Sequence, residues 1–451
     1  MPPWLAVLCL APSAWNLLRS EPVNLAQEPG TPSLRHLFVT RVGGHNAKST
    51  VSGILALLAL SFTACSTHDF PQYPPNYREY AYVTNGQSGT VTVLDVVNVR
   101  VDRELAVGQN PVAVAASPNR NEVYVVNSNA EGTEGSVSVV DAEKNAVVAT
   151  IPVHRRPVAI DLDRTGTLAY VANSGSNTIS VIDLTTRREV AQIGTGEEPV
   201  ALRVSPDGKT LVVANRRAGS VSIADLANLA SLSSPVDLTR RPSTRSVRAV
   251  FDGCPGANDV VILPDSSKAF VACSAGHQVM AIALARRKTG SSQPDRPSTD
   301  QLETFMDVGR APVQLALKPD GGELFVSNSL SDSISEVVTS TNDVGGAYAM
   351  GDDPVRGLVS SDNSMLYIAN FRSQWVTVYA PEDGRRIASI HVGDGPSALA
   401  FSSNGYLLFV VDTRSGDVAV VRTRAPKPSL FALLPAGRAP NSIAVKSFKI
   451  P

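Results

Sequence analysis

The sequence is poor in the residues that most often carry chemistry. Its 451 residues include four cysteines and six histidines, and the cysteines show neither a CxxC pair nor a Cys/His spacing suited to a metal. Four cysteines are also too few for a fold that depends on a disulfide scaffold. The GxSxG motif of α/β-hydrolases is absent. We therefore expect no metal, no cofactor and no recognisable catalytic motif.

Neither sign of charge dominates the chain. Lysine and arginine together number 40, aspartate and glutamate 41, and the formal net charge is -1. A balance of this kind does not favour nucleic acid as a partner. Hydrophobic residues make up 43% of the sequence, which is typical of a globular protein long enough to bury a large core.

The apolar run Ile54–Leu60 is too short to span a membrane. Basic residues between positions 35 and 48 precede it and small residues follow it, which is the order of a secretory signal. Its last four residues, "FTAC" at 62–65, resemble a bacterial lipobox. The resemblance implies that Cys65 becomes the lipid-modified first residue of the mature protein. A plain signal peptide from Met1, or a single N-terminal membrane anchor, is the alternative.

Three parts of the chain are expected from this pattern. Residues 1–64 are an N-terminal extension and a lipoprotein-type signal peptide, with translation expected to start near Val39 or Val42. Residues 65–79 are the lipidated cysteine and a Pro-rich tether. Residues 80–451 are the folded domain. Resemblance to Gram-negative lipoproteins, with Ser66 after the cysteine, implies the periplasmic side of the outer membrane.

One short motif recurs eight times in the folded part. It reads AYVTN, VYVVN, AYVAN, LVVAN, AFVAC, LFVSN, LYIAN and LFVVD, with last residues at Asn85, Asn127, Asn173, Asn215, Cys273, Asn328, Asn370 and Asp412. The gaps between successive motifs are 42, 46, 42, 58, 55, 42 and 42 residues. Each unit holds four runs rich in Val, Ile, Tyr and Thr, separated by turn residues, which predicts four antiparallel strands per unit. About 42 residues is the length of one β-propeller blade.

The two ends of this region predict how the ring closes. The first unit starts at its second strand, near Ala81, and the chain ends on a first strand, Ile443–Val445, with nothing after it. A ring whose last strand completes the first blade leaves no open sheet edge. The fold class is thus all-β, a single propeller closed by the C-terminal strand.

The motifs "PVAVAASPNRNEVYVVN" and "PSALAFSSNGYLLFVVD" resemble those of the YVTN family of β-propeller repeat proteins. The likeness covers Ala81–Phe448. Such propellers usually have seven blades, but the motif count here favours eight, with seven as the alternative. The family includes lactonase-type propellers, which keeps an enzyme possible by resemblance.

Arginines recur in loops that should share one face of this propeller. We expect a ligand site there from Arg156, Arg216, Arg310, Arg372, Trp375, Arg414 and Arg438. Arginine suits bidentate recognition of a carboxylate or phosphate, and a ring mouth is concave. The alternative is a solvated rim of mixed charge. The repeated asparagines, by contrast, are expected to hold turns by bonding nearby backbone.

Cys254 and Cys273 should lie on the same face of one blade. In an oxidising compartment they can form a disulfide, and two partly buried thiols are the alternative. His154, His277 and His391 show no metal-ligand spacing and are expected at the surface.

The function that follows is a lipid-anchored periplasmic binding or scaffolding module. It is expected to be a monomer whose partner is an envelope protein or a small anionic ligand, with the membrane reached only through the lipid. A lactonase-like hydrolase with its site at the channel mouth, and an accessory subunit of a periplasmic redox or envelope complex, are the alternatives.

Overall fold

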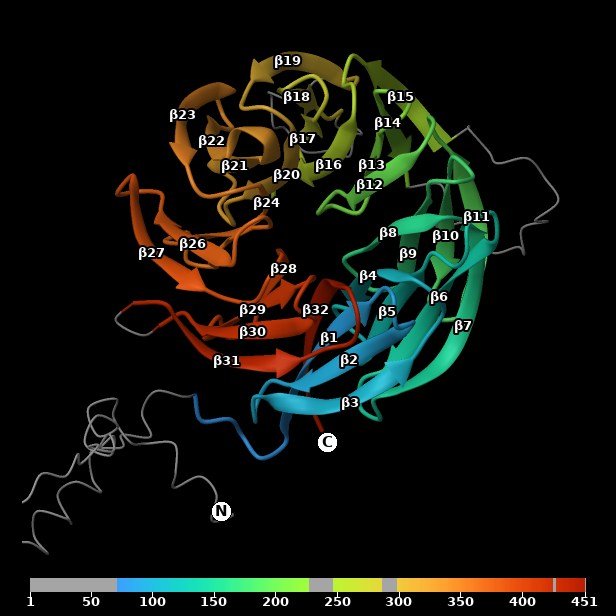
Figure 1. The fold of residues 1–451 in the computed structure, drawn as a ribbon. Coiled ribbons are helices and arrows are strands. Elements are labelled where there is room, and N and C mark those ends of the chain that lie inside the picture. The colour runs from blue at the N-terminus through green and yellow to red at the C-terminus, as the bar shows by residue number, and fades with distance from the viewer. Residues whose placement is uncertain (1–70, 227–245, 286–297, 425–426, 451) are drawn as a thin grey trace, which may run out of the picture. The chain divides into compact units, whose positions relative to one another are not determined.

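The computed structural model describes residues 71–226, 246–285, 298–424 and 427–450. These residues form eight four-stranded antiparallel sheets, arranged as blades around a central channel (Figure 1). The predicted all-β propeller is confirmed, with eight blades rather than seven. The expected signal peptide and Cys65 lie outside the described residues.

The blades are numbered here from the N-terminus, and their strands are given from the channel outward. Blade 1 holds β32 (Pro440–Lys449), β1 (Tyr77–Asn85), β2 (Thr90–Asp95) and β3 (Arg100–Ala106); blade 2 holds β4 (Pro111–Ala116), β5 (Glu122–Asn127), β6 (Glu134–Asp141) and β7 (Ala146–Arg155). Blade 3 holds β8 (Pro157–Leu162), β9 (Leu168–Asn173), β10 (Thr178–Asp183) and β11 (Arg188–Gly194); blade 4 holds β12 (Pro199–Val204), β13 (Thr210–Asn215), β14 (Ser220–Asp225) and β15 (Val247–Asp252). Blade 5 holds β16 (Ala257–Ile262), β17 (Lys268–Cys273), β18 (Gln278–Ala283) and β19 (Gln301–Asp307); blade 6 holds β20 (Pro312–Leu317), β21 (Glu323–Asn328), β22 (Ser333–Val338) and β23 (Asp343–Ala349). Blade 7 holds β24 (Pro354–Val359), β25 (Leu366–Asn370), β26 (Trp375–Ala380) and β27 (Arg385–His391); blade 8 holds β28 (Pro396–Phe401), β29 (Leu407–Asp412), β30 (Asp417–Arg422) and β31 (Ser429–Pro435).

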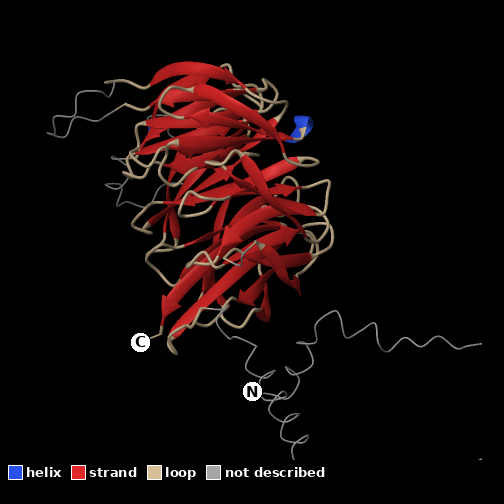
Figure 2. Cartoon of the chain, turned by 90° about the vertical axis from the view of Figure 1, so that its left-hand side faces the viewer, coloured by secondary structure: helices blue, strands red, loops and turns tan. Residues whose placement is uncertain are grey.

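Strands make up nearly all of the regular secondary structure of the described residues, and the 3-10 helix η5 (Ser329–Ser331) lies in the β21–β22 loop (Figure 2). The second and third strands of each blade are covered on both faces by neighbouring blades. This is why motifs such as "LAYVAN" in β9 are continuously apolar rather than alternating. The core is therefore divided among the blade interfaces, with side chains such as Tyr170 of blade 3 packing against Leu211 of blade 4.

The ring closes through the two ends of the propeller. β32 pairs antiparallel with β1, with Val83 opposite Ile443 and Ala81 opposite Val445. The predicted closure is confirmed. β1 begins at Tyr77, three residues before the expected start of the folded domain, because the pairing continues to Lys449.

The repeated asparagine joins the second strand of a blade to its third. In blade 3, Asn173 is fully buried and its Nδ2 donates to Thr178 Oγ1 at 3.3 Å and to Ser180 Oγ at 2.9 Å. Five further blades repeat the bond to a third-strand hydroxyl, through Asn85, Asn127, Asn215, Asn328 and Asn370. The role is structural, but the main partners are hydroxyl groups rather than the backbone we expected. The glycine that lies two residues after most fourth strands follows from this packing: a Cβ on Gly108 would lie 2.6 Å from Asn127 Cβ.

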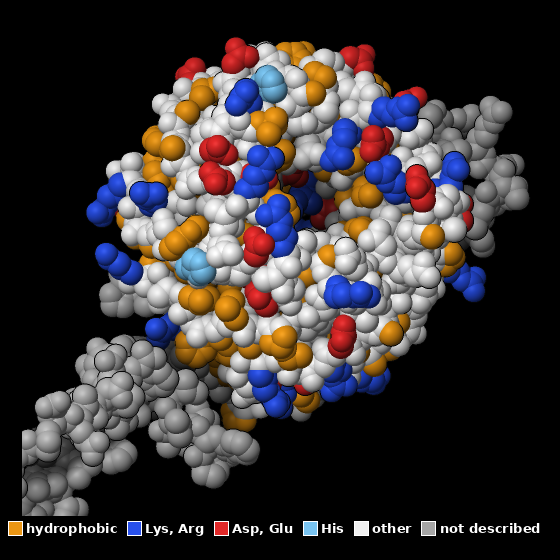
Figure 3. Space-filling view, viewed as in Figure 1, with side chains coloured by type: hydrophobic (Ala, Val, Ile, Leu, Met, Phe, Trp, Pro, Cys, Tyr) orange, Lys and Arg blue, Asp and Glu red, His pale blue; other side chains and the backbone are white. Residues whose placement is uncertain are grey.

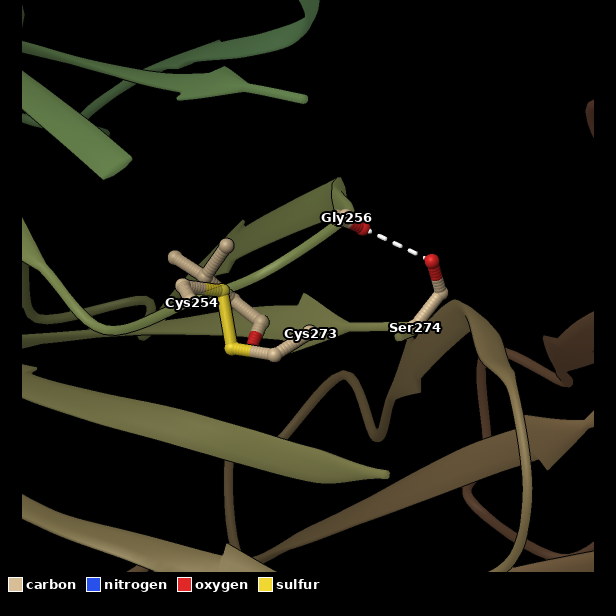
Figure 4. Close-up of a disulfide and its surroundings, with 5 residues drawn as sticks. Cys254, Gly256, Cys273 and Ser274 are labelled. Carbon is tan, nitrogen blue, oxygen red and sulfur yellow. Dashed lines mark hydrogen bonds between the residues drawn. A yellow bond between two sulfur atoms is a disulfide. The ribbon is translucent and has the colours of Figure 1, made fainter. Parts of the chain in front are cut away.

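Blade 5 replaces this asparagine with a disulfide. Cys273 occupies the asparagine position, and its sulfur is bonded to that of Cys254, with a Cα–Cα distance of 4.8 Å (Figure 4). The third strand of the same blade has Gln278 and Met280 where blade 4 has Ser220 and Ser222. Blade 5 thus lacks both the asparagine amide and the third-strand hydroxyl groups that accept its hydrogen bonds in other blades.

Blade 8 replaces the asparagine with Asp412, which is fully buried. One carboxylate oxygen accepts the N–H of Gly393 at 3.0 Å. Burial, followed by the hydrogen bond and the negative charge of Asp417, raises the pKa of Asp412 to about 9. This carboxyl therefore retains its proton in the folded protein at neutral pH.

Deleting residues 440–451 should open the ring. Loss of β32 leaves β1 with an unpaired edge and uncovers the neighbouring blades, at a cost comparable to the whole folding free energy of about 5–15 kcal/mol. Thermal unfolding followed by circular dichroism, with size-exclusion chromatography, should show a non-cooperative or aggregating protein. Deleting only residues 450 and 451, which leaves β32 whole, is the control. A truncated protein that stays monomeric with an unchanged Tm would contradict this prediction.

Replacing Cys254 and Cys273 together by alanine should destabilise the protein by about 3 kcal/mol. Their sequence separation is 19, and a loop of about this size restricts the unfolded chain by roughly that amount. Urea denaturation with and without a reductant measures the effect. The reductant should lower the midpoint of the wild type and leave that of the double variant unchanged; equal midpoints for all samples would be the contrary result.

Asp412→Asn should stabilise the protein increasingly as the pH rises. The folded pKa of Asp412, about 9, lies above the ordinary value of 3.8, so the stability from this carboxyl is complete below about pH 4 and is lost as the pH rises towards 9. An amide avoids this loss and can donate to Asp417, which should add about 1–3 kcal/mol at pH 8. Denaturation midpoints between pH 5 and 9 test this, with the exposed Glu131→Gln as control. Parallel pH profiles for wild type and D412N would refute it.

Candidate functional site

The predicted arginines all lie in loops at one face of the propeller. Strands alternate in direction, so the loops that enter a blade and the loops between its second and third strands emerge together. The entering loops carry Arg156, Arg310 and Arg438, and the second-to-third-strand loops carry Arg216, Arg372 and Arg414. This is the face that η5 marks, and Figure 3 shows basic and acidic side chains interspersed on it around the channel mouth.

Most of these rim arginines already contact groups of nearby loops. The ion pairs, with nitrogen–oxygen distances, are Arg156–Glu198 at 3.7 Å, Arg372–Asp353 at 3.4 Å and Arg414–Asp394 at 3.7 Å. Arg310 donates instead to the carbonyl of Leu330 at 2.8 Å. The arginine side chains in the three ion pairs are well exposed, so each pair contributes at most about 1 kcal/mol. The predicted arginines are therefore distributed around the rim and do not converge on a single site.

Trp375 lies at the outer side of this face. It starts the third strand of blade 7, and its ring meets His391 of the outermost strand edge to face, with ring centroids 4.9 Å apart. Of the seven predicted ligand residues, only Arg216 lines the cavity in the channel, where it bonds Asn258.

The channel itself contains a cavity of about 840 Å³. The first strand of every blade except blade 8 contributes its second residue to the lining, and the third residues follow below. Most of these side chains are small and apolar. The exceptions among the second and third residues are Asn441 and Ser442 of β32, Asn258 and Asp259 of β16, Gln314 of β20 and Arg356 of β24. Arg203 of β12 adds a charged side chain deeper in the lining. Figure 3 shows basic and acidic side chains inside the opening.

Arg356 and Arg203 are the principal charges in this cavity, and sequence reasoning missed both. Arg356 is the third residue of β24 and Arg203 the fifth residue of β12, so Arg203 lies deeper by about 7 Å along the strand direction. Burial lowers the pKa of the Arg356 guanidinium. The negative charge of Asp259 opposes this shift, and the nearby positive charge of Arg203 adds to it. Arginine side chains carry a positive charge in proteins, so the cavity holds two positive charges from these residues.

The donors of these two guanidinium groups are largely unused. Among the residues that the structure describes, Arg203 has one long hydrogen bond, from Nη1 to the carbonyl of Leu202 at 3.4 Å. Within the same residues, Arg356 has no hydrogen-bond partner and no ion pair within 4 Å. Each guanidinium can make five hydrogen bonds. The channel therefore presents an excess of donors.

The carboxylates in and beside the channel, and the amide of Gln314, are bonded to the backbone. Asp161 accepts the N–H of Val204 at 2.8 Å, and Asp259 accepts that of Leu315 at 3.0 Å, in each case from the next blade. Gln314 accepts the N–H of Gly357 at 2.6 Å. Burial raises the pKa of Asp161, against the opposing effects of Arg203 and of two backbone N–H groups. These side chains tie the inner strands together and leave the arginines as the groups free to bind.

A signal for this site was present in the sequence. Aligned on their second strands, the blades have Ala113, Ala159, Ala201 and Ala398 at the position of Arg356 in blade 7. An arginine in place of alanine on an innermost strand is a larger departure than an arginine in a loop. Among the described residues no group of three or more potential metal ligands is found, and no helix is long and apolar enough to cross a membrane.

The comparisons with known proteins agree with the propeller fold. Residues 80–194 match the family model of the lactonase, 7-bladed beta-propeller. No curated protein matches the sequence.

Solved structures resemble the whole ring. The dihydro-heme d1 dehydrogenase NirN in complex with DHE has a TM-score of 0.61 and 16% identity, over 83% of this chain and 76% of NirN. A candidate 6-phosphogluconolactonase from Bacteroides fragilis has a TM-score of 0.53 and 15% identity, over 84% of this chain and 100% of its own. A second such candidate, from Bacteroides uniformis, has a TM-score of 0.51 and 16% identity, over 82% and 100%. At these identities the likeness establishes a β-propeller and leaves the activity open.

Proposed function

We propose that the protein is a binding module that holds a small anionic ligand in its central channel. One observation carries the proposal: Arg203 and Arg356 bring two guanidinium groups with unused donors into one cavity. The cavity, at about 840 Å³, is of the size that small-molecule sites have. The ligand supplies the hydrogen-bond acceptors that the described side chains do not.

The energetics favour an anion at this point. Two like charges held in a partly desolvated channel raise the free energy of the empty protein, and the nearest carboxylates are already bonded to backbone N–H groups. An anion that bridges the arginines removes the repulsion and forms charge-assisted hydrogen bonds, which are roughly twice as strong as neutral ones. Arg216 at the mouth lies on the path that such a ligand would take.

The rim has a secondary role in this proposal. Its arginines alternate with acids at the channel mouth, so they orient an entering anion by local fields rather than by net charge. In the scaffolding form of the proposal, an envelope protein binds to this face. An accessory subunit of a redox or envelope complex would use the same face. We propose that the protein acts as a monomer.

The proposed location is the periplasmic side of the outer membrane, through a lipid on Cys65. The order of basic residues, apolar run and small residues before Cys65 supports it.

A lactonase-like hydrolase is the second candidate. The match of residues 80–194 to the lactonase family model favours it. In such an enzyme Arg203 and Arg356 would bind the acid group of the substrate, and Asp161 or Asp259 would have to give up a backbone bond to act as a base. Turnover of a panel of lactones by the wild type, lost in R356Q, would favour the enzyme over the binding module.

Calorimetric titration of the purified protein with phosphate, sulfate, succinate and citrate tests the proposal. We expect saturable binding of at least one of these anions. Arg356→Gln and Arg203→Gln should each weaken it about 10- to 100-fold, the effect of losing a charge-assisted hydrogen bond. Arg188→Gln, on the exposed outer strand of blade 3, is the matched control and should bind like the wild type. Absence of binding, or equal binding by all variants, would overturn the proposal.

A further inference from the structure

We infer that the channel ligand is an amphipathic anion, with its charged group against blades 4 to 7 and an apolar body against blades 8, 1 and 2. This inference rests on the proposed function, since it concerns the same cavity. It adds the chemical class of the ligand and the orientation in which it binds.

The first observation is the division of the channel wall. Apart from Asn441, the charged and amide side chains of the lining come from four consecutive blades, 4 to 7, and are Arg203, Arg216, Asn258, Asp259, Gln314 and Arg356. Across the channel, blades 8 and 2 contribute Ala398 and Ala113 at the third position of their first strands. The ring would spread polar residues evenly if they served only to solvate the channel. Their restriction to one half gives the cavity two chemically different walls.

Blade 1 completes the apolar half even though its first strand begins with polar residues. Asn441 is engaged on both sides of its amide: Nδ2 donates to the carbonyl of Pro111 at 3.0 Å, and Oδ1 accepts from Thr84 at 2.6 Å. Ser442 is the small polar residue of this wall, and Ile443 follows it in the cavity lining. This blade therefore contributes no charged side chain to the cavity, and its amide is already bonded at both the nitrogen and the oxygen.

The second observation is the exposure of the fourth residue of each first strand. In blades 3 to 6 this residue is buried, as Ile160, Leu202, Val260 and Leu315, and although three of them border the cavity they expose little surface to it. In blades 8, 1 and 2 the equivalent residues, Leu399, Ile443 and Val114, are only half-buried and line the cavity. Apolar side chains that the fold can bury elsewhere are thus left facing the cavity on the wall opposite the arginines.

Two walls of this kind select a ligand with two ends. A compact anion would satisfy the guanidinium groups and leave the apolar wall exposed, whereas an anion with an alkyl or ring substituent can cover it. Each methylene group moved from water to an apolar surface strengthens binding about fourfold. The affinity for such a ligand should therefore grow with its apolar length until the cavity is filled.

The other blades provide matched variants that the fold already tolerates. Val112→Asn places in blade 2 the residue that blades 1 and 5 carry at the equivalent position, as Asn441 and Asn258. Ala398→Gln places in blade 8 the residue that blade 6 carries, as Gln314. Both changes make the apolar wall polar without altering an arginine.

The experiment is a calorimetric series with inorganic phosphate and with n-alkyl monophosphates from methyl to hexyl. For the wild type we expect affinity to rise about three- to fourfold per methylene. In V112N/A398Q the rise should fall below twofold per methylene, while the affinity for inorganic phosphate changes less than twofold. Unchanged circular dichroism and unfolding midpoint of the double variant show that the fold is kept.

The outcomes separate the two proposals. Wild-type protein that binds inorganic phosphate with no gain from the alkyl chain overturns the amphipathic ligand and leaves the channel anion site standing. A gain that persists in full in V112N/A398Q places the apolar body on some other surface and also overturns the inference. Failure of the wild type to bind any member of the series, phosphate included, contradicts the anion site itself.

Discussion

Everything in this protein depends on the pairing of β32 with β1. The first strand of each blade is bonded to its own second strand on one side and faces the channel on the other. Eight such edges enclose a common space only when the ring is complete, and β32 supplies the eighth from the far end of the chain. The closure thus fixes which side chains share the cavity, because it sets the spacing of all eight inner strands.

The sequence was sufficient for the fold because the fold is built from local and repeated signals. The blade count came from eight motifs such as that ending at Asn173, and the closure from an unpaired run at Ile443–Val445. The candidate site was not found in this way. Arg216 and Arg372 drew attention because they lie in loops, but whether a loop arginine is free depends on acids such as Asp353, brought close by the fold. Arg356 required knowing that its position faces the channel, which follows from the strand register and the bulge after Pro354.

Departures from the repeat are not all of one kind. The asparagine position shows three ways of holding the second strand to its surroundings: an amide bonded to hydroxyls, a disulfide at Cys273, and a protonated carboxyl at Asp412. In each case the neighbouring residues changed in step, as with Met280 in blade 5. A compensated departure of this sort indicates a structural role, because the replacement residue bonds to other residues of the fold.

The channel arginines are not accompanied by a compensating change in neighbouring residues. No described residue near Arg356 accepts a hydrogen bond from its guanidinium. Asp259, the carboxylate whose charge acts on Arg356, is bonded to the backbone of the next blade. A guanidinium in this position lowers the stability of the empty ring and gives the fold nothing that the alanines of four other blades do not give. Ligand binding recovers the stability that these groups cost the empty ring, and this explains why the protein retains two of them. The uncompensated departures, rather than the most numerous charges, therefore mark the place where this propeller meets its ligand.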